Sequence, residues 1–285
     1  MNTTGDYHTG VGYNALAANT TGSSSVAVGG LSLLNNTTGS SNVAIGVQAL
    51  QDNTTANKIV AVGRDALKVN TTGTANVAVG ANALDASNAD YCTAIGRSVL
   101  GANTTGTQNT AVGSNAMDTN TTGGYNSALG TNALSSNTTG SENVAIGRQA
   151  LDDNTTAIRN VAVGNGALKT NTTGANNVAI GYVALYSNTT ASYNTAVGDD
   201  AMYSNTTGAG NVAYGAYSLY DNTTGHSNTA LGSYSPSNGG SNIVAPMRFN
   251  VSGSYNIAIG TGCLLYTSDA ADEGLGVDLG GRRII

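Results

Sequence analysis

The sequence predicts an all-β fold, a parallel β-solenoid of about 14 to 15 coils, and three observations lead to this prediction. The word Asn-Thr-Thr recurs at an interval of 17 residues through residues 1–232, with one slipped copy near Ser87. Each copy contains a short segment in which apolar and small residues alternate, which is a strand pattern. Gly, Asn and Thr dominate the remainder, and no 3.6-residue apolar stripe indicates a helix.

The strand of each repeat lies at positions 7–11 when the Asn of Asn-Thr-Thr is position 1. The repeat then reads N-T-T-G-x-x-N-V-A-V-G-x-x-A-L-x-x, and in one copy the strand segment runs from Asn42 to Gly46. Alternation places Val43 and Ile45 on one face, which we expect to be the core, and Ala44 on the other. The Leu or Met at position 15 predicts a second, shorter strand that is also buried.

The corners of each coil are predicted from Asn, Gly and Thr. Asn and Gly tolerate left-handed backbone geometry, and Thr hydroxyls can bond to nearby backbone groups. This role explains the repeated Asn-x-Thr sequons better than glycosylation does. Position 11 is Gly in all 14 copies, from Gly12 to Gly232, which fits a positive φ or a close backbone approach. Stacking would also align the position-7 Asn residues into an amide ladder.

The second face of the strand carries only small residues, because position 9 is Ala in 13 copies and Gly10 in the other. A solvated strand face would accept larger side chains, so we expect another backbone to pack against this one. Each coil also offers few large apolar side chains to offset the entropy of ordering 17 residues. These points predict association with identical chains through an Ala face that includes Ala111, Ala145 and Ala179.

The strand words resemble those of two families of surface proteins. The segments NVAIG, NVAVG and NTAVG, each followed by an Ala three residues after the Gly, resemble head repeats of trimeric autotransporter adhesins. The full word N-T-T-G-x-x-N-T-A-V-G-x-x-A-L is similar to repeats in bacteriophage tail-fibre and related surface proteins. The resemblance covers Met1–Gly262 and implies a left-handed β-roll in a homotrimer.

The function implied by the tail-fibre resemblance is that of a non-enzymatic structural or receptor-binding shaft segment on a virion. The alternative is the head of a bacterial trimeric adhesin at the cell surface. Tyrosines gather between Tyr182 and Tyr234, and exposed Tyr can bind a host-surface glycan or protein. An ice-binding solenoid with stacked Thr is a remote alternative, because the two adjacent Thr of each corner would face opposite sides.

Four segments are expected along the chain. The insertion SYSPSNGGSNIVAPMRF holds both prolines and the only Phe, and it is either a projecting binding element or a kink between coils. The segments are the repeat solenoid at 1–232, the irregular insertion at 233–249, a final partial coil at 250–262, and a foreign tail at 263–285.

The tail resembles translated library DNA. Cys263–Glu273 matches one end of a transposase-type sequencing adapter, and Val277–Ile285 matches the other end at the spacing of an index barcode. We therefore expect Cys263–Ile285 to be non-native and without function, and the chain to be a metagenomic fragment that lacks both true termini. Cys92 is then the only native cysteine, so no internal disulfide is expected.

Composition and motifs indicate no enzyme chemistry. The net charge of −6 and the pI of about 4.6 argue against a function in binding nucleic acid. No stretch approaches the roughly 20 apolar residues of a membrane helix. His8 and His226 are far apart in the sequence, and the paired Asp residues at 152–153 and 199–200 are expected in solvated turns. We assign no catalytic, cofactor-binding or metal-binding residue.

Overall fold

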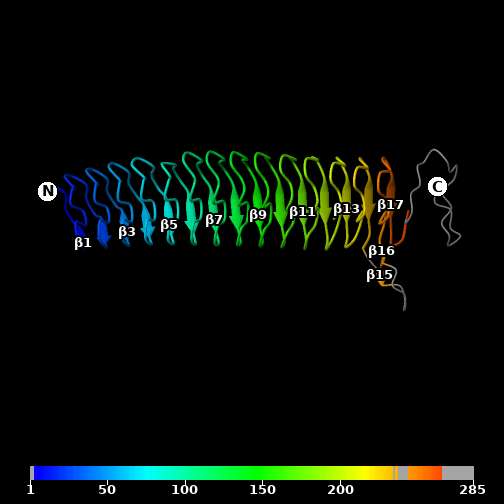
Figure 1. Cartoon of the computed structure of the whole chain (residues 1–285), viewed down its shortest axis with the longest axis horizontal. Helices are drawn as coiled ribbons and strands as arrows, with labels where there is room; N and C mark the ends of the chain where they lie inside the picture. Colours follow the sequence, from blue (N-terminus) through cyan, green and yellow to red (C-terminus); the bar gives the residue numbers. More distant parts are fainter. Residues whose placement is uncertain (1–2, 234, 237–242, 265–285) are drawn as a thin grey trace. The chain divides into compact units, whose positions relative to one another are not determined.

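A computed structural model of the chain describes residues 3–233, 235–236 and 243–264. The chain forms two compact units, Met1–Arg148 and Gln149–Ile285, and each is described by itself. In both units the described backbone folds into stacked coils, with one strand per repeat and no helix among the described residues (Figure 1). The prediction of an all-β parallel solenoid is therefore confirmed.

The first unit contains nine parallel strands of three residues, and each strand pairs with the same repeat positions of the next coil. The register holds through the slipped copy, where Val77 pairs with Thr93. The missing residue is absorbed at the corner, because Oδ1 of Asn88 accepts the backbone N–H of Thr71 at 2.7 Å and its hydroxyl at 2.9 Å. The strands are β1 Thr9–Val11, β2 Val26–Val28, β3 Val43–Ile45, β4 Val60–Val62, β5 Val77–Val79, β6 Thr93–Ile95, β7 Thr110–Val112, β8 Ser127–Leu129 and β9 Val144–Ile146.

The described residues of the second unit form six such parallel strands and one short antiparallel pair. Two strands that are neighbours in the sheet, β14 and β17, enclose the sequence insertion, and its described parts β15 and β16 pair antiparallel. The strands are β10 Val161–Val163, β11 Val178–Ile180, β12 Thr195–Val197, β13 Val212–Tyr214, β14 Thr229–Leu231, β15 Ser235–Pro236, β16 Ile243–Val244 and β17 Ile257–Ile259.

The chain returns to the repeat before the expected end of the insertion. Met247 is fully buried at position 15, and Pro246 accepts a backbone hydrogen bond from Leu219 of the preceding coil at 3.1 Å. Cys263 and Leu264 occupy positions 14 and 15 of the last described coil, where Cys263 O accepts the Met247 N–H at 3.0 Å. The rest of the tail, residues 265–285, lies outside the described residues.

The core contains the small residues of the strand, so the expected orientation of the strand is wrong. Ala44 has no exposed surface, whereas Ile45 is 39% exposed and Val43 is half-buried. The reason is seen at Gly10, the one position-9 glycine: an added Cβ would lie 3.7 Å from Ala15 O and 3.8 Å from a methyl of Leu16. The opposite wall of the same coil therefore leaves room for a methyl group only.

The return wall of the coil, at positions 12–17, is not a strand. The prediction of a second, shorter strand at position 15 is therefore wrong. Positions 12–17 form turns, and Leu at position 15 has a φ near 50°, as in Leu50 and Leu134. Left-handed residues at positions 13 and 15 break the pleat of a strand. The wall is still bonded from coil to coil, since Leu33 N–H donates to Ala49 O at 3.0 Å. The Leu side chains are buried, as expected.

Two amide ladders run through the interior. The expected ladder at position 7 is confirmed, because Asn126 donates to Oδ1 of Asn109 through its backbone N–H at 2.9 Å and its side chain at 3.2 Å. A second ladder at position 1 was not predicted, and in it Asn36 Nδ2 donates to Asn19 Oδ1 at 2.7 Å. Both rows are buried, and neighbouring coils supply their hydrogen bonds except at Asn70, whose Oδ1 lies beside the slipped copy without a partner. The rows therefore stabilise the stack rather than oppose it.

Each Asn-Thr-Thr corner is held by hydrogen bonds to one backbone carbonyl of the adjacent coil. The Thr37 carbonyl accepts four hydrogen bonds from the preceding coil: from Thr20 N–H at 3.0 Å, Thr20 Oγ1 at 2.9 Å, Thr21 N–H at 3.1 Å and Gly22 N–H at 3.3 Å. The left-handed residue closest to this corner is position 6, such as Tyr125 with φ 61°, rather than the Asn or Gly of the word. Position 11 has the expected positive φ, 133° at Gly113.

Candidate functional site

The outer side of the strands is the most unusual surface of both units. We call it the strand face and define it as positions 8 and 10 of β1–β9 in the first unit, and of β10–β14 and β17 in the second. Because position 9 points inward, the strand face presents mainly Val, Ile, Leu and Thr to solvent. Val11 is 58% exposed and Leu129 is 50% exposed in the first unit, and Ile259 is 64% exposed in the second.

The strand face is bordered by aromatic and basic side chains. Positions 6 and 12 lie two residues before and after its two outward positions. Position 6 includes Tyr91 and Tyr125, which are 63% and 61% exposed. Position 12 includes Arg64, Arg97 and Arg148, all exposed. An apolar centre with Tyr and Arg around it is the composition of protein interfaces.

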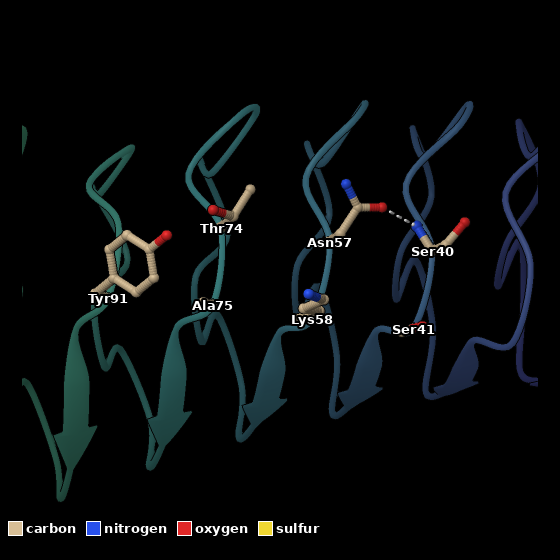
Figure 2. Close-up of a pocket in the computed structure, with 7 residues that line it drawn as sticks. All are labelled: Ser40, Ser41, Asn57, Lys58, Thr74, Ala75 and Tyr91. Atoms are coloured by element: carbon tan, nitrogen blue, oxygen red, sulfur yellow. Dashed lines mark hydrogen bonds between the residues drawn. The ribbon is translucent and has the colours of Figure 1, made fainter.

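The first unit also has a shallow hollow of about 410 Å³ on its position 5 and 6 side (Figure 2). Its walls are polar, and Asn57 Oδ1 accepts the Ser40 backbone N–H at 2.7 Å. Lys58 is the only charged side chain among its lining residues. These groups offer hydrogen bonds but include no acid paired with a base. The lining residues are Ser40, Ser41, Asn57, Lys58, Thr74, Ala75 and Tyr91.

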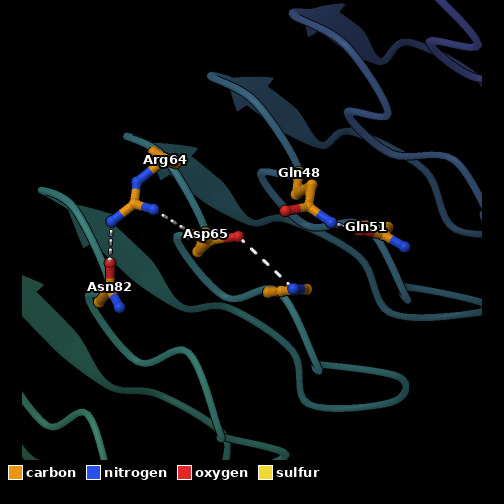
Figure 3. Close-up of polar contacts among 6 residues, drawn as sticks. Gln48, Gln51, Arg64, Asp65 and Asn82 are labelled. Carbon is orange, nitrogen blue, oxygen red and sulfur yellow. Dashed lines mark hydrogen bonds and ion pairs between the residues drawn. The ribbon is translucent and has the colours of Figure 1, made fainter.

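Polar side chains at positions 13 and 16 touch one another on the return wall (Figure 3). Asp65 lies 3.6 Å from Lys68 and 3.5 Å from Arg64, and Arg64 donates to Asn82 at 3.3 Å. Burial, together with the neighbouring Asp65, raises the pKa of Asp85 above its ordinary value. These contacts are ion pairs and side-chain hydrogen bonds at the surface, of the kind that add little to stability.

The acidic pairs and histidines considered in the sequence do not form a reactive centre. Burial raises the pKa of Asp153 and of Asp200, and in each case the adjacent Asp adds to the shift. His8 occupies a ladder position, where Nε2 lies 2.7 Å from Gly22 O, and His226 packs edge-on to Tyr255 at 4.9 Å. Within the described ranges, no three His, Cys, Asp or Glu side chains gather as metal ligands.

The sequon asparagines are structural. Asn36 and Asn120 have no exposed surface, and the side-chain amide of Asn120 donates to Asn103 Oδ1 at 2.7 Å and to Gly123 O at 3.0 Å. An amide held in this way is inaccessible to a modifying enzyme, which supports the corner interpretation. The two Thr of a corner differ: at Thr121, position 2 is half-buried and its hydroxyl donates to the Thr138 carbonyl, whereas Thr122 at position 3 is exposed.

Comparison of the chain with protein-family models gives no match, and comparison with curated proteins also gives none. In the part of the chain that the structure describes, no helix has the length and hydrophobicity needed to cross a membrane.

Proposed function

We propose that the chain is a non-enzymatic structural shaft segment whose strand face packs against identical chains. The setting that we favour is a bacteriophage tail fibre, from the resemblance of the full repeat word, with a bacterial surface adhesin as the alternative. The observation that carries the proposal is the exposed row of Val, Ile and Leu along the strands of each unit.

The size of the strand face favours a stable interface. In the first unit, nine strands about 4.8 Å apart make a strip on the order of 40 Å long. Including positions 6–12, the strip is about 20 Å wide at roughly 3.3 Å per residue. The resulting area, on the order of 800 Å², equals the share of one partner in a typical specific interface. Exposed apolar rows with a polar rim on a protein surface are commonly interaction sites.

The spacing of the strand face favours an identical chain as the partner. Its side chains repeat with the rise of the coils, so a partner must have the same rise to contact every row. A second copy of the solenoid has that rise by construction, and closed symmetric association of identical chains is the usual form of oligomer. Three copies around one axis, as in the homotrimers of the resembling families, would cover all three strand faces.

The interior of the coils favours a structural role for the chain. Within each unit most coils repeat the same Ala, Leu and Asn rows, and neighbouring coils are joined through backbone and side-chain ladders. Such nearest-neighbour stacking is how repeat proteins extend in one direction. Flanking gene sequence would separate the two settings: a chaperone domain beside virion genes supports the fibre, and a signal peptide with an outer-membrane anchor supports the adhesin.

Sedimentation equilibrium of the whole chain tests the proposal. The intact chain should have the mass of an oligomer, and the triple variant Val62→Lys, Val79→Lys and Val112→Lys should be a folded monomer. A matched variant with Lys at the exposed position-3 residues Thr55, Thr72 and Thr122 should keep the oligomer. An intact chain that is monomeric, or a strand-face variant that keeps its mass, would refute self-association through this face.

A further inference from the structure

The second unit departs from the repeat at position 16, where three tyrosines stack. We call Tyr186, Tyr203 and Tyr220 the tyrosine column. The ring centroids are 5.2 Å apart between the first two and 5.3 Å apart between the last two, and each pair is within 9° of parallel. A cation lies over each end: Lys169 Nζ is 5.7 Å from the Tyr186 centroid, and Arg248 Cζ is 5.5 Å from that of Tyr220.

The backbone holds the tyrosine column in register. Tyr203 O accepts the Ser187 N–H at 3.0 Å, and Tyr220 O accepts the Ser204 N–H at 3.0 Å. Gly166, at position 13 of the preceding coil, lies beside the first ring, and an added Cβ there would be in ordinary van der Waals contact with the Tyr186 ring at 3.5 Å. The column is therefore ordered before any ligand arrives, which lowers the entropic cost of binding.

We propose that the tyrosine column binds an extended neutral polysaccharide that lies along the stack, with one sugar unit beside each coil. The rings are half-buried and stacked on one another, so their edges and phenol groups face outward. This gives one apolar edge and one hydroxyl per coil, a spacing close to the length of one sugar in an extended chain. A phenol both donates and accepts hydrogen bonds, as sugar hydroxyls require.

The charges around the column favour a neutral ligand. The two cations at its ends are over ring faces, and carboxylates of Asp200 and Asp221 lie in the same coils. Burial raises the pKa of Tyr217, which contacts Asp200, and the pKa of Tyr220. The carboxylates repel an acidic polymer and accept hydrogen bonds from sugar hydroxyls.

This inference goes beyond the proposed shaft function, and its test is independent of oligomeric state. Affinity electrophoresis of the whole chain through gels that contain hydroxyethyl cellulose should show retardation, and gels that contain alginate, an acidic polysaccharide, should show none. The variant Tyr186→Ser, Tyr203→Ser and Tyr220→Ser should bind at least about tenfold more weakly. Ser135 occupies the same repeat position naturally, so this variant should fold.

A second triple variant shows whether the removal of any three tyrosines, and not of the tyrosine column in particular, weakens binding. Tyr91, Tyr125 and Tyr193 are exposed at position 6, where Ser24 and Ser41 occur naturally. Changing these three tyrosines to Ser should leave the retardation unchanged. The proposal is overturned if the intact chain is not retarded by the neutral polymer, if alginate retards it equally, or if both triple variants lose binding to the same extent.

Discussion

Two adjacent glycines in the first unit provide a sharp test of how the coils stack. Gly29, at position 11, has φ 134°, and a Cβ added to it would lie 2.6 Å from the carbonyl carbon of Gly46 and even closer to its oxygen. Gly30, at position 12, has nothing within 4 Å of an added Cβ. We expect Gly29→Ala to destabilise the fold strongly and Gly30→Ala to be neutral or slightly stabilising.

The expected loss of stability in Gly29→Ala combines two free-energy costs. An Ala at this φ costs about 1–3 kcal/mol, because only glycine adopts this backbone region readily. Relieving the contact moves the next coil and weakens its ladder bonds, from Gly46 N–H to Val28 O at 2.8 Å and from Gln48 N–H to Gly30 O at 2.9 Å. At about 1 kcal/mol per bond, the total is about 3–5 kcal/mol. Gly30→Ala should raise the free energy of unfolding by at most about 1 kcal/mol, because Ala has fewer conformations than Gly in the unfolded chain.

Hydrogen exchange is the suitable assay, because stacked coils can open locally without global unfolding. In Gly29→Ala, the amides of Gly46 and Gln48 should exchange far faster than in the intact chain, while amides several coils away keep their protection. In Gly30→Ala both amides should stay protected. Equal exchange in the two variants would refute the close backbone approach at position 11.

Two further predictions concern buried and half-buried polar groups. Asn120→Ala removes the hydrogen bonds to Asn103 and Gly123 and should lower the free energy of unfolding, measured in urea, by about 2–4 kcal/mol. Thr122→Ala, on the exposed corner, should change it by no more than about 0.5 kcal/mol. Burial raises the pKa of Asp85 in the folded chain above 3.8, so its contribution to stability is present below that pH and is lost as pH rises through the folded pKa. Asp85→Asn should therefore be more stable than the intact chain at pH 7, with a difference that disappears in acid; an equal difference at both pH values would contradict this.

The repeat period was sufficient to predict the fold class, the strand at each copy and the ladder at position 7. A period of 17 residues requires equivalent coils, and equivalent coils bring the same residue types together, as Asn109 and Asn126 show. The left-handed Leu at position 15 could not be predicted in this way. Leu rarely adopts a positive φ, and only the packing of the return wall against the strand imposes it here.

The orientation of the strand is the instructive error. Alternation separates Val43 and Ile45 from Ala44 but does not say which set faces inward. The usual assumption, that the larger apolar residues are buried, fails because the two walls of the coil are too close for them. The constancy of Ala at position 9 did indicate close backbone packing, but the backbone is the opposite wall of the same coil. Ala111, Ala145 and Ala179 are consequently core residues rather than an interface.

Ala111 faces the core of its coil, and we propose that its neighbour Val112 faces a second chain; sedimentation velocity of two variants distinguishes the two positions. Ala111 has no exposed surface and Val112 is half-buried on the strand face. Ala111→Arg should sediment as an expanded, partly unfolded species. Val112→Arg should sediment as a compact species of lower mass than the intact oligomer. The opposite pattern, with Ala111→Arg compact and dissociated and Val112→Arg expanded, would contradict the account.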